Sequence, residues 1–204
     1  MKQILVMMVV LVGCSKDTPE TSQAAEAEPQ VAPAPTPEPT PVSPADEKLI
    51  ADPIVEKAVR LNASKFEGEL TENDLAKVKT TDFSATKITD ASLKEVAKLQ
   101  QLKKLWLSAT KITDAGLEEV SKLQKLKFIG LDNTNITDAG LKEVAKLQSL
   151  TQLSLADTKV TDACLKELAK MQQLKMLGLN DTKITDAGVA ELQKALPNCQ
   201  ITGP

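Results

Sequence analysis

Residues 99–122 read LQQLKKLWLSATKITDAGLEEVSK, and residues 123–146 read LQKLKFIGLDNTNITDAGLKEVAK. These two units decide the fold, because the second repeats the first after 24 residues. A fixed period in the twenties is typical of a solenoid in which each repeat packs only against its neighbours. The period marks one threonine per unit, at Thr86, Thr110, Thr134, Thr158 and Thr182. It also marks one aspartate per unit, at Asp90, Asp114, Asp138, Asp162 and Asp186.

Each unit is predicted to form a short strand followed by a short helix. Leu105 and Leu107 alternate with polar or outward residues, which is the period of a strand with one buried face. A helix is expected to start after Thr113, whose hydroxyl would accept a backbone N–H as an N-cap. Ile112 and Leu117 then have the spacing of a hydrophobic staple.

The other side of the predicted helix is polar. Asp114 at the first helical position faces the positive end of the helix dipole. Glu118 and Lys122 have the i,i+4 spacing of a helical ion pair. We therefore expect a solvated outer face that carries charges of both signs.

The strand pattern resembles a known repeat family. Leu102-x-x-Leu105-x-Leu107-x-x-Thr110-x-Ile112 is similar to the leucine-rich repeat, with threonine where that family often has asparagine or cysteine. The ITDAGL motif resembles a widespread bacterial subclass and also the repeats of F-box substrate adaptors, although no F-box-like segment precedes it here. The resemblance implies an α/β solenoid with parallel strands on the concave face and short helices on the convex face.

Positions inside the repeats have structural interpretations. The threonines represented by Thr110 are expected to form a ladder in which each hydroxyl bonds to neighbouring backbone. Ser92 and Cys164 share their position with Gly116 and Gly140, so that position needs a small side chain rather than a positive φ. Cys164 is then a packing residue. We expect no disulfide between Cys164 and Cys199. Cys199 lies 11 residues after Gly188, the repeat equivalent of Cys164, and is therefore too far from it.

The two ends of the array differ from its centre. Asp52 and Pro53 predict the start of an amphipathic helix, which with a shortened first repeat from Leu70 to the region of Phe83 resembles internalin-like N-terminal caps. At the other end, Leu192, Leu196 and Ile201 are expected to cover the last repeat. Residues 46–204 are thus predicted to form one repeat domain.

Residues 1–13 have the features of an export signal. One positive charge precedes nine consecutive apolar residues, which are too few to span a bilayer. Leu11-Val12-Gly13-Cys14 resembles the lipobox of bacterial lipoproteins, which implies cleavage before Cys14 and acylation of that cysteine. Ser15 stands where an inner-membrane retention signal has aspartate. The resemblance therefore implies a lipid anchor at the bacterial cell envelope, in the outer membrane if the cell has two, with the domain on the exported side.

Residues 14–45 are predicted to be a disordered tether behind that anchor. The stretch contains eight of the 11 prolines, and apart from Cys14 its only other hydrophobic residues are alanines and two valines. Alternating prolines favour polyproline II, which at about 3.1 Å per residue would reach roughly 90 Å from the membrane. Recognition of the proline-rich segment by a partner is a second interpretation.

Composition excludes several classes of function. The chain has no histidine, which removes Ser-His-Asp and Cys-His catalysis and histidine-ligated zinc. Neither a phosphate-binding glycine loop nor a paired-cysteine motif is present. Asp132, Asp157 and Asp181 lie near strand ends, where a calcium site is a minor alternative, but no carboxylate-rich loop gathers ligands there. We therefore expect no enzyme, no cofactor and no metal site.

Charge argues against nucleic acid as a partner. Residues 1–45 hold two of the 25 basic and five of the 28 acidic residues, so 46–204 carries 23 of each. A neutral domain without a basic stripe is a poor nucleic-acid candidate.

Function is then expected from the exposed side chains of the strands. Trp106 and Phe128 would lie diagonally on one face, with room for the indole beside Gly130. The leading hypothesis is a non-catalytic, lipid-anchored module that binds a protein or peptide, and the alternative is an envelope spacer without a specific ligand. The candidate ligand-binding residues are Lys104, Trp106, Phe128, Asp132, Gln152, Met176 and Asn180.

Overall fold

The computed structural model describes residues 48–203. The predicted signal peptide, Cys14 and the tether lie outside the described residues. Six strands form one sheet: β1 (Thr80–Asp82), β2 (Lys104–Trp106), β3 (Phe128–Gly130), β4 (Gln152–Ser154), β5 (Met176–Gly178) and β6 (Gln200–Thr202). The helices are α1 (Pro53–Ala63), α2 (Glu72–Lys77), α3 (Asp90–Val96), α4 (Asp114–Val120), α5 (Asp138–Val144), the 3-10 helix η1 (Asp162–Cys164), α6 (Leu165–Leu168) and α7 (Asp186–Ala195).

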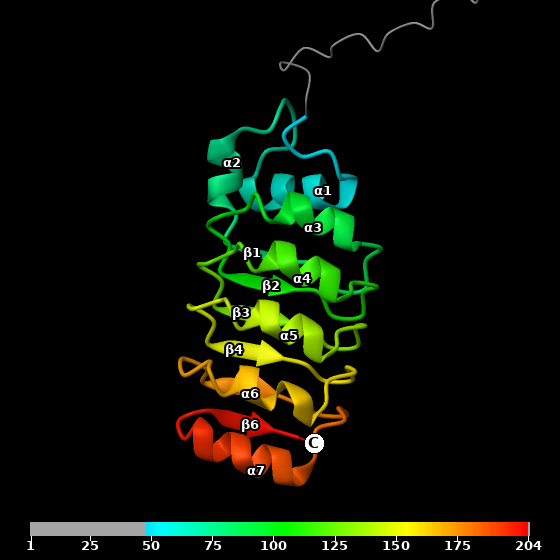
Figure 1. Ribbon diagram of the computed structural model, residues 1–204. Coiled ribbons are helices and arrows are strands. Elements are labelled where there is room, and N and C mark those ends of the chain that lie inside the picture. Colours follow the sequence, from blue (N-terminus) through cyan, green and yellow to red (C-terminus); the bar gives the residue numbers. More distant parts are fainter. Residues whose placement is uncertain (1–47, 204) are drawn as a thin grey trace, which may run out of the picture. The chain divides into compact units, whose positions relative to one another are not determined.

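The strands are parallel, adjacent in chain order and in register with the repeat. Leu105 pairs with Ile129, which pairs with Leu153 and so on, each step advancing 24 residues. Successive helices α3, α4, α5 and α6 lie side by side along the stack, on the side of the repeats away from the strands (Figure 1). The predicted α/β arrangement of strands and helices in separate layers is confirmed. None of the helices in residues 48–203 is long and apolar enough to span a membrane.

The core is a set of aliphatic columns between the two layers. Leu105, Ile129 and Leu177 are at most 1% exposed, and Leu153 is 2% exposed. Leu93, Leu117 and Leu141 on the helices meet them from the other side and are fully buried, while the equivalent Leu165 is partly buried. Every repeat has its apolar residues at equivalent positions, so they contact those of the neighbouring repeats. Each repeat is therefore covered by its neighbours and need not bury its apolar surface alone.

The predicted threonine ladder is confirmed. The hydroxyls of Thr110, Thr134 and Thr158 each donate a 2.6 Å hydrogen bond to the carbonyl oxygen three residues earlier. These threonines are 6% exposed, so each bond satisfies a polar group that would otherwise be buried without a partner.

A second ladder, which the sequence interpretation missed, joins successive repeats. The carboxylate of Asp90 accepts the backbone N–H of Thr113 at 2.9 Å and the hydroxyl of Thr113 at 2.7 Å. Thr113 is the N-cap of α4 by its backbone, but its hydroxyl accepts no N–H of that helix, so the expected side-chain cap is absent there. The equivalent hydroxyls of Thr137, Thr161 and Thr185 do accept an N–H of their own helices. The same two bonds join Asp114 to Thr137, Asp138 to Thr161 and Asp162 to Thr185.

This ladder explains the small residue that follows in each repeat. A Cβ at Gly116 would lie 2.5 Å from Oδ1 of Asp90 and 2.6 Å from a methyl carbon of Leu93, while the backbone φ there is not positive. At Cys164, which does carry a Cβ, the first turn is the 3-10 helix η1. Ser92 has no aspartate one repeat before it, since Phe66 stands there, and α3 stays regular. The prediction of a position chosen for size is confirmed.

Removing one rung should measure what the ladder contributes. Asp114→Ala is expected to lower the free energy of unfolding by about 3 kcal/mol, since it removes two hydrogen bonds to a carboxylate. Asp186→Ala is the matched control, because Asp186 also begins a helix but has no repeat after it to bond. It should cost less than about 1 kcal/mol, the helix-dipole contribution alone. Urea denaturation checks both, and equal losses would contradict a role for the ladder.

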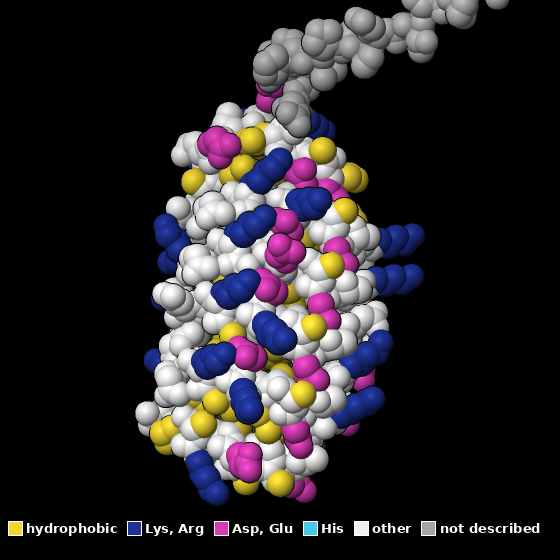
Figure 2. Space-filling model, viewed as in Figure 1, with side chains coloured by type: hydrophobic (Ala, Val, Ile, Leu, Met, Phe, Trp, Pro, Cys, Tyr) yellow, Lys and Arg dark blue, Asp and Glu magenta, His cyan; other side chains and the backbone are white. Residues whose placement is uncertain are grey.

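The charges on the helical face pair differently from the sequence expectation. Lys122 contacts Glu119 at 2.6 Å rather than Glu118, because α4 ends at Val120 and Lys122 lies in the following turn. Figure 2 shows lysines and acidic residues mixed over the face that the helices form. Ion pairs three residues apart recur at Lys98–Glu95, Lys146–Glu143 and Lys170–Glu167.

Both predicted caps are present. Asp52 caps α1 by accepting the N–H groups of Ile54 and Val55, and Pro53 takes the first helical position. Helix α2 and strand β1 form the shortened first repeat that the sequence indicates. At the other end Leu192 and Leu196 are buried under the final turn. The caps close both ends of the hydrophobic core.

Candidate binding face

The exposed side chains of the six strands form one continuous surface, here called the sheet face. It consists of the first and third residues of each strand, because the middle residue of each points into the core. Trp106, Phe128 and Gln152 are half-buried, while Lys104 is exposed and Met176 is 48% exposed. Strand register places Lys104, Phe128, Gln152 and Met176 in one row across four repeats. The structure thus brings these five predicted residues together.

Trp106 and Phe128 pack against each other on this face. Their ring centroids are 4.7 Å apart and the planes are inclined by 41°. Trp106 stands beside Gly130 in the register, and a Cβ built on Gly130 would lie 3.4 Å from both rings. The glycine therefore gives the indole room over the next strand, as the sequence predicts. A larger residue at 130 would press on both aromatic rings.

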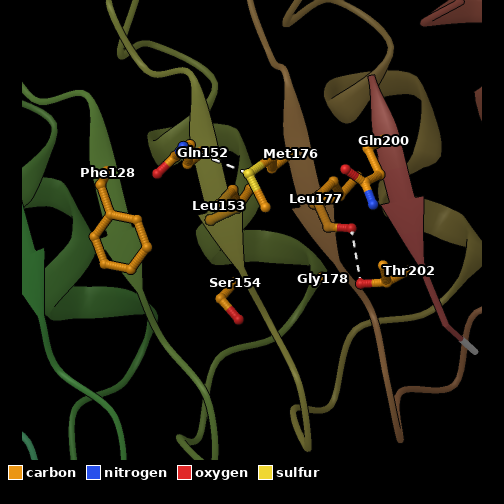
Figure 3. Close-up of a pocket in the computed structure, with 9 residues that line it drawn as sticks. All are labelled: Phe128, Gln152, Leu153, Ser154, Met176, Leu177, Gly178, Gln200 and Thr202. Atoms are coloured by element: carbon orange, nitrogen blue, oxygen red, sulfur yellow. Dashed lines mark hydrogen bonds between the residues drawn. The ribbon is translucent and has the colours of Figure 1, made fainter. Parts of the chain in front are cut away.

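A shallow depression of about 210 Å³ follows the aromatic pair along the face. In Figure 3 Phe128 forms one side of it, and Gln152 lies over the adjoining strand with its amide donating to the Met176 sulfur at 3.5 Å. The far side is formed by Gln200 and Thr202 of β6, two residues that the sequence interpretation missed. Gln200 lies 24 residues after Met176, so the repeat period alone could have identified it. The lining residues are Phe128, Gln152, Leu153, Ser154, Met176, Leu177, Gly178, Gln200 and Thr202.

Asp132 is held within the repeat stack. Its carboxylate accepts the hydroxyl of Ser108 at 3.1 Å, the hydroxyl of Ser154, and the N–H of Ala156 at 3.0 Å. These donors come from the repeats on either side, so Asp132 links three layers. Asn180, one of the other predicted residues, is exposed in the corresponding place two repeats later.

Asp157 and Asp181 lie at a left-handed backbone position that alanine occupies in the first repeats, at Ala85 and Ala109. Both adopt a left-handed conformation after a strand, with φ of 54° and 56°. Asn133 has the same conformation one repeat earlier. Aspartate and asparagine tolerate this conformation better than most residues, because their short side chains bond locally. Within residues 48–203 no group of three or more acidic or cysteine residues is placed to hold a metal ion.

A second depression, of about 500 Å³, lies at the N-terminal cap. Helix α1 contributes Pro53, Ile54, Ala58 and Leu61, and Phe83 closes its base. Leu61 is 58% exposed, and Phe66 in the following loop is 72% exposed. The sequence interpretation missed Phe66, because a lone aromatic in a turn carries no periodic signal.

The local environments of two cysteines and one aspartate shift their pKa values. Burial, together with the nearby Asp138 carboxylate, raises the pKa of the Cys164 thiol to about 12. Burial also raises the pKa of Cys199, and both cysteines are free. Hydrogen bonds from Lys65, Thr71 and Lys77 hold the pKa of Asp74 well below its usual range. Neither thiol is a thiolate at neutral pH, so neither is set up as a nucleophile.

The repeat domain is similar to several solved structures. A leucine-rich-repeat protein of Leptospira interrogans is 26% identical and superposes with a TM-score of 0.51. The fold is a leucine-rich-repeat solenoid. The match covers 66% of this chain but only 34% of the Leptospira protein, which is therefore much longer than the shared part.

Two listerial proteins also match this leucine-rich-repeat chain. Internalin C2 of Listeria monocytogenes is 19% identical with a TM-score of 0.44, covering 76% of this chain and 95% of that one. An internalin F of the same species is 18% identical with a TM-score of 0.49, covering 76% and 56%. No protein-family model and no curated protein sequence matches the chain.

Proposed function

We propose that this chain is a non-catalytic, lipid-anchored leucine-rich-repeat module that binds a protein or peptide partner at the bacterial cell envelope. The observation that carries the proposal is the Trp106–Phe128 pair beside the depression on the sheet face. The chain has only one tryptophan and three phenylalanines, and two of these four aromatics lie together on a solvent-facing sheet.

The chemistry of this surface suits a macromolecular partner. Tryptophan is enriched among the residues that dominate protein interfaces, and neighbouring aromatics present a large area at little cost in conformational entropy. Met176, at the other end of the row, adds a flexible apolar contact. Gln152 lies between Phe128 and Met176, and Gln200 and Thr202 follow beyond Met176, so the face combines apolar and polar groups as many interfaces do.

Catalysis has no support in the described domain. The chain lacks histidine, and the two thiols of the repeats are buried and protonated. A binding surface is therefore the better account of the sheet face than an active site.

Partner capture tests the binding face directly. Trp106→Ala combined with Phe128→Ala is expected to abolish recovery of the crosslinked partner from the native envelope, because it removes the apolar centre of the face. The free energy of unfolding should fall only modestly, by about 1–2 kcal/mol. Leu61→Ala with Phe66→Ala is the matched control, since it removes two exposed apolar side chains away from the sheet face. The control should capture the partner normally.

Either of two results would remove this face from consideration. One is undiminished capture by the double variant. The other is blue tryptophan emission that soluble quenchers do not reach in the free domain, which would show that Trp106 is covered. Absence of any specific crosslinked partner would favour the alternative, an envelope spacer whose repeats bind nothing specific.

The lipid anchor is tested separately at Cys14. Cys14→Ser is expected to abolish incorporation of labelled fatty acid and to leave the precursor uncleaved, since lipidation and cleavage both depend on that thiol in proteins with a lipobox. The same change at Cys164 is the control and should leave labelling intact. Equal labelling of wild type and Cys14→Ser would contradict the anchor.

A further inference from the structure

The neutral sum of charges in the domain conceals a separation by position. The turn and strand of four successive repeats, residues 99–106, 123–130, 147–154 and 171–178, contain no aspartate or glutamate. The same segments contain five lysines and no arginine. The acidic residues of these repeats lie on the helices and in the loops after the strands. The lysines are Lys103, Lys104, Lys125, Lys127 and Lys175.

Backbone pairing aligns Lys103, Lys127 and Lys175 of these repeats, together with Lys79 of the first repeat, along the edge where the strands begin. These four residues are here called the lysine strip. The N–H of Lys103 bonds to the carbonyl of Lys79 at 2.8 Å, and the N–H of Lys127 bonds to the carbonyl of Lys103 at 2.8 Å. Neighbouring strands are about 4.8 Å apart, so the charges are closely spaced. Thr151 interrupts the strip before Lys175. The sequence expectation of a domain without a basic stripe is therefore wrong, because the stripe forms only when the repeats stack.

The strip is unlike the lysines of the helical face. There Lys98, Lys122, Lys146 and Lys170 each contact a glutamate. Lys79, Lys103 and Lys127 are exposed and have no carboxylate partner within residues 48–203. Holding several like charges together without counter-charges raises the local potential and favours an anionic partner.

The strip adjoins the apolar part of the sheet face. Lys127 immediately precedes Phe128, and Lys175 immediately precedes Met176. Lys104 lies in the same row as both apolar residues. At the opposite edge of the face Asp82 and Asp132 are engaged with the protein itself, by the N–H of Ser84 and by the donors already described. Lysines also lie at this opposite edge, among them Lys87 and Lys111, but acidic residues accompany them there, at Asp82, Asp132, Asp157 and Asp181. Only the border where the strands begin is free of aspartate and glutamate, in residues 99–106, 123–130, 147–154 and 171–178.

We propose that the sheet face binds an extended acidic peptide segment with an apolar side chain at its centre. The apolar side chain would occupy the depression beside Phe128, and the carboxylates would face the lysine strip. This inference rests on the proposed function and specifies the class of partner. Single-stranded nucleic acid fits less well, because Trp106 and Phe128 face each other at 4.7 Å instead of offering open rings for base stacking, and the strip has no arginine.

A displayed library of random twelve-residue peptides is a suitable probe. Selection on residues 14–204 is expected to enrich peptides with at least three acidic residues around one aromatic or large aliphatic residue. Binding of the best peptide should weaken at least tenfold between 50 and 500 mM salt, since screening acts on exposed charge pairs.

Paired lysine variants locate the effect. Lys103→Gln with Lys127→Gln is expected to weaken binding of the selected peptide about five- to tenfold. Lys87→Gln with Lys111→Gln is the matched control, because these two exposed lysines are also 24 residues apart but lie at the edge where the strands end. The control should bind the peptide as wild type does.

The outcomes separate this inference from the proposed function. Neutral peptides that require Trp106 and Phe128 but tolerate the Lys103 and Lys127 changes would overturn the acidic class and leave the binding face in place. Peptides that still bind after loss of Trp106 and Phe128 would overturn both the binding face and the acidic peptide class. An oligonucleotide, an anionic vesicle or the chain's own 15–45 segment binding through the same lysines as tightly as the peptide would also overturn the assignment.

Discussion

Leu153→Asp is expected to unfold the repeat domain under native conditions. Leu153 is 2% exposed and stands between Ile129 and Leu177 in the central column of the core. A carboxylate there would be buried without a partner, and the leucine side chain would leave a cavity. The combined loss should exceed about 5 kcal/mol, which is comparable to the whole stability of many domains. Circular dichroism and urea titration measure it.

The adjacent residue provides the control for that substitution. Gln152→Asp places the same carboxylate one position earlier in β4, where the side chain lies on the sheet face. Its effect should stay within about 1 kcal/mol, as for most surface changes. If Gln152→Asp unfolds the domain as readily as Leu153→Asp, the assignment of inward and outward strand positions is wrong.

Deleting half a repeat is expected to be as damaging as the buried charge, whereas deleting a whole repeat is not. Removing residues 111–134 joins Thr110 to Asn135, which follows Thr134 in the native chain at the same point of the period. The leucine columns, the threonine ladder and the aspartate ladder then continue across the junction. The shortened domain should remain folded and unfold cooperatively, because stability is approximately a sum over repeats and their interfaces.

Removing only residues 111–122 has the opposite consequence. This deletion takes out α4 but keeps the strand of the next repeat, so the columns lose one layer on the helical side. The helices α3 and α5, which pack on α4, would then lack their common neighbour. We expect loss of cooperative unfolding and an expanded elution volume. Equal circular dichroism and melting for the two deletions would contradict the repeat architecture.

The local sequence determined much of the fold. The alternation of Leu105 and Leu107 predicted the strands, the 24-residue period predicted their register, and Asp52-Pro53 predicted the start of α1. It also placed Trp106 beside Gly130, because the register of a regular repeat follows directly from counting. These features depend on residues close in the chain or exactly one period apart.

The role of the ITDAG motif required the structure. Asp114 has the signature of a helix N-terminus in the sequence, but its carboxylate bonds to Thr137 of the next repeat. Local capping and bonding between repeats use the same residue types, so the sequence pattern does not separate them. The correct partner of Lys122 was missed for a related reason, because it depended on where α4 stops.

The sequence by itself determined the repeat, the buried columns and the candidate residues of the sheet face. Only the tertiary structure decided which polar groups bond to one another, such as Asp114 to Thr137, and which lysines have a glutamate partner. Lys79, Lys103 and Lys127 are separated by 24 residues in a chain segment with as many acids as bases, so no local window reveals a strip. Parallel stacking brings them to adjacent strands about 4.8 Å apart and moves the acids to other surfaces. Charge patterns on a solenoid arise from the spacing between repeats, which sequence composition does not record.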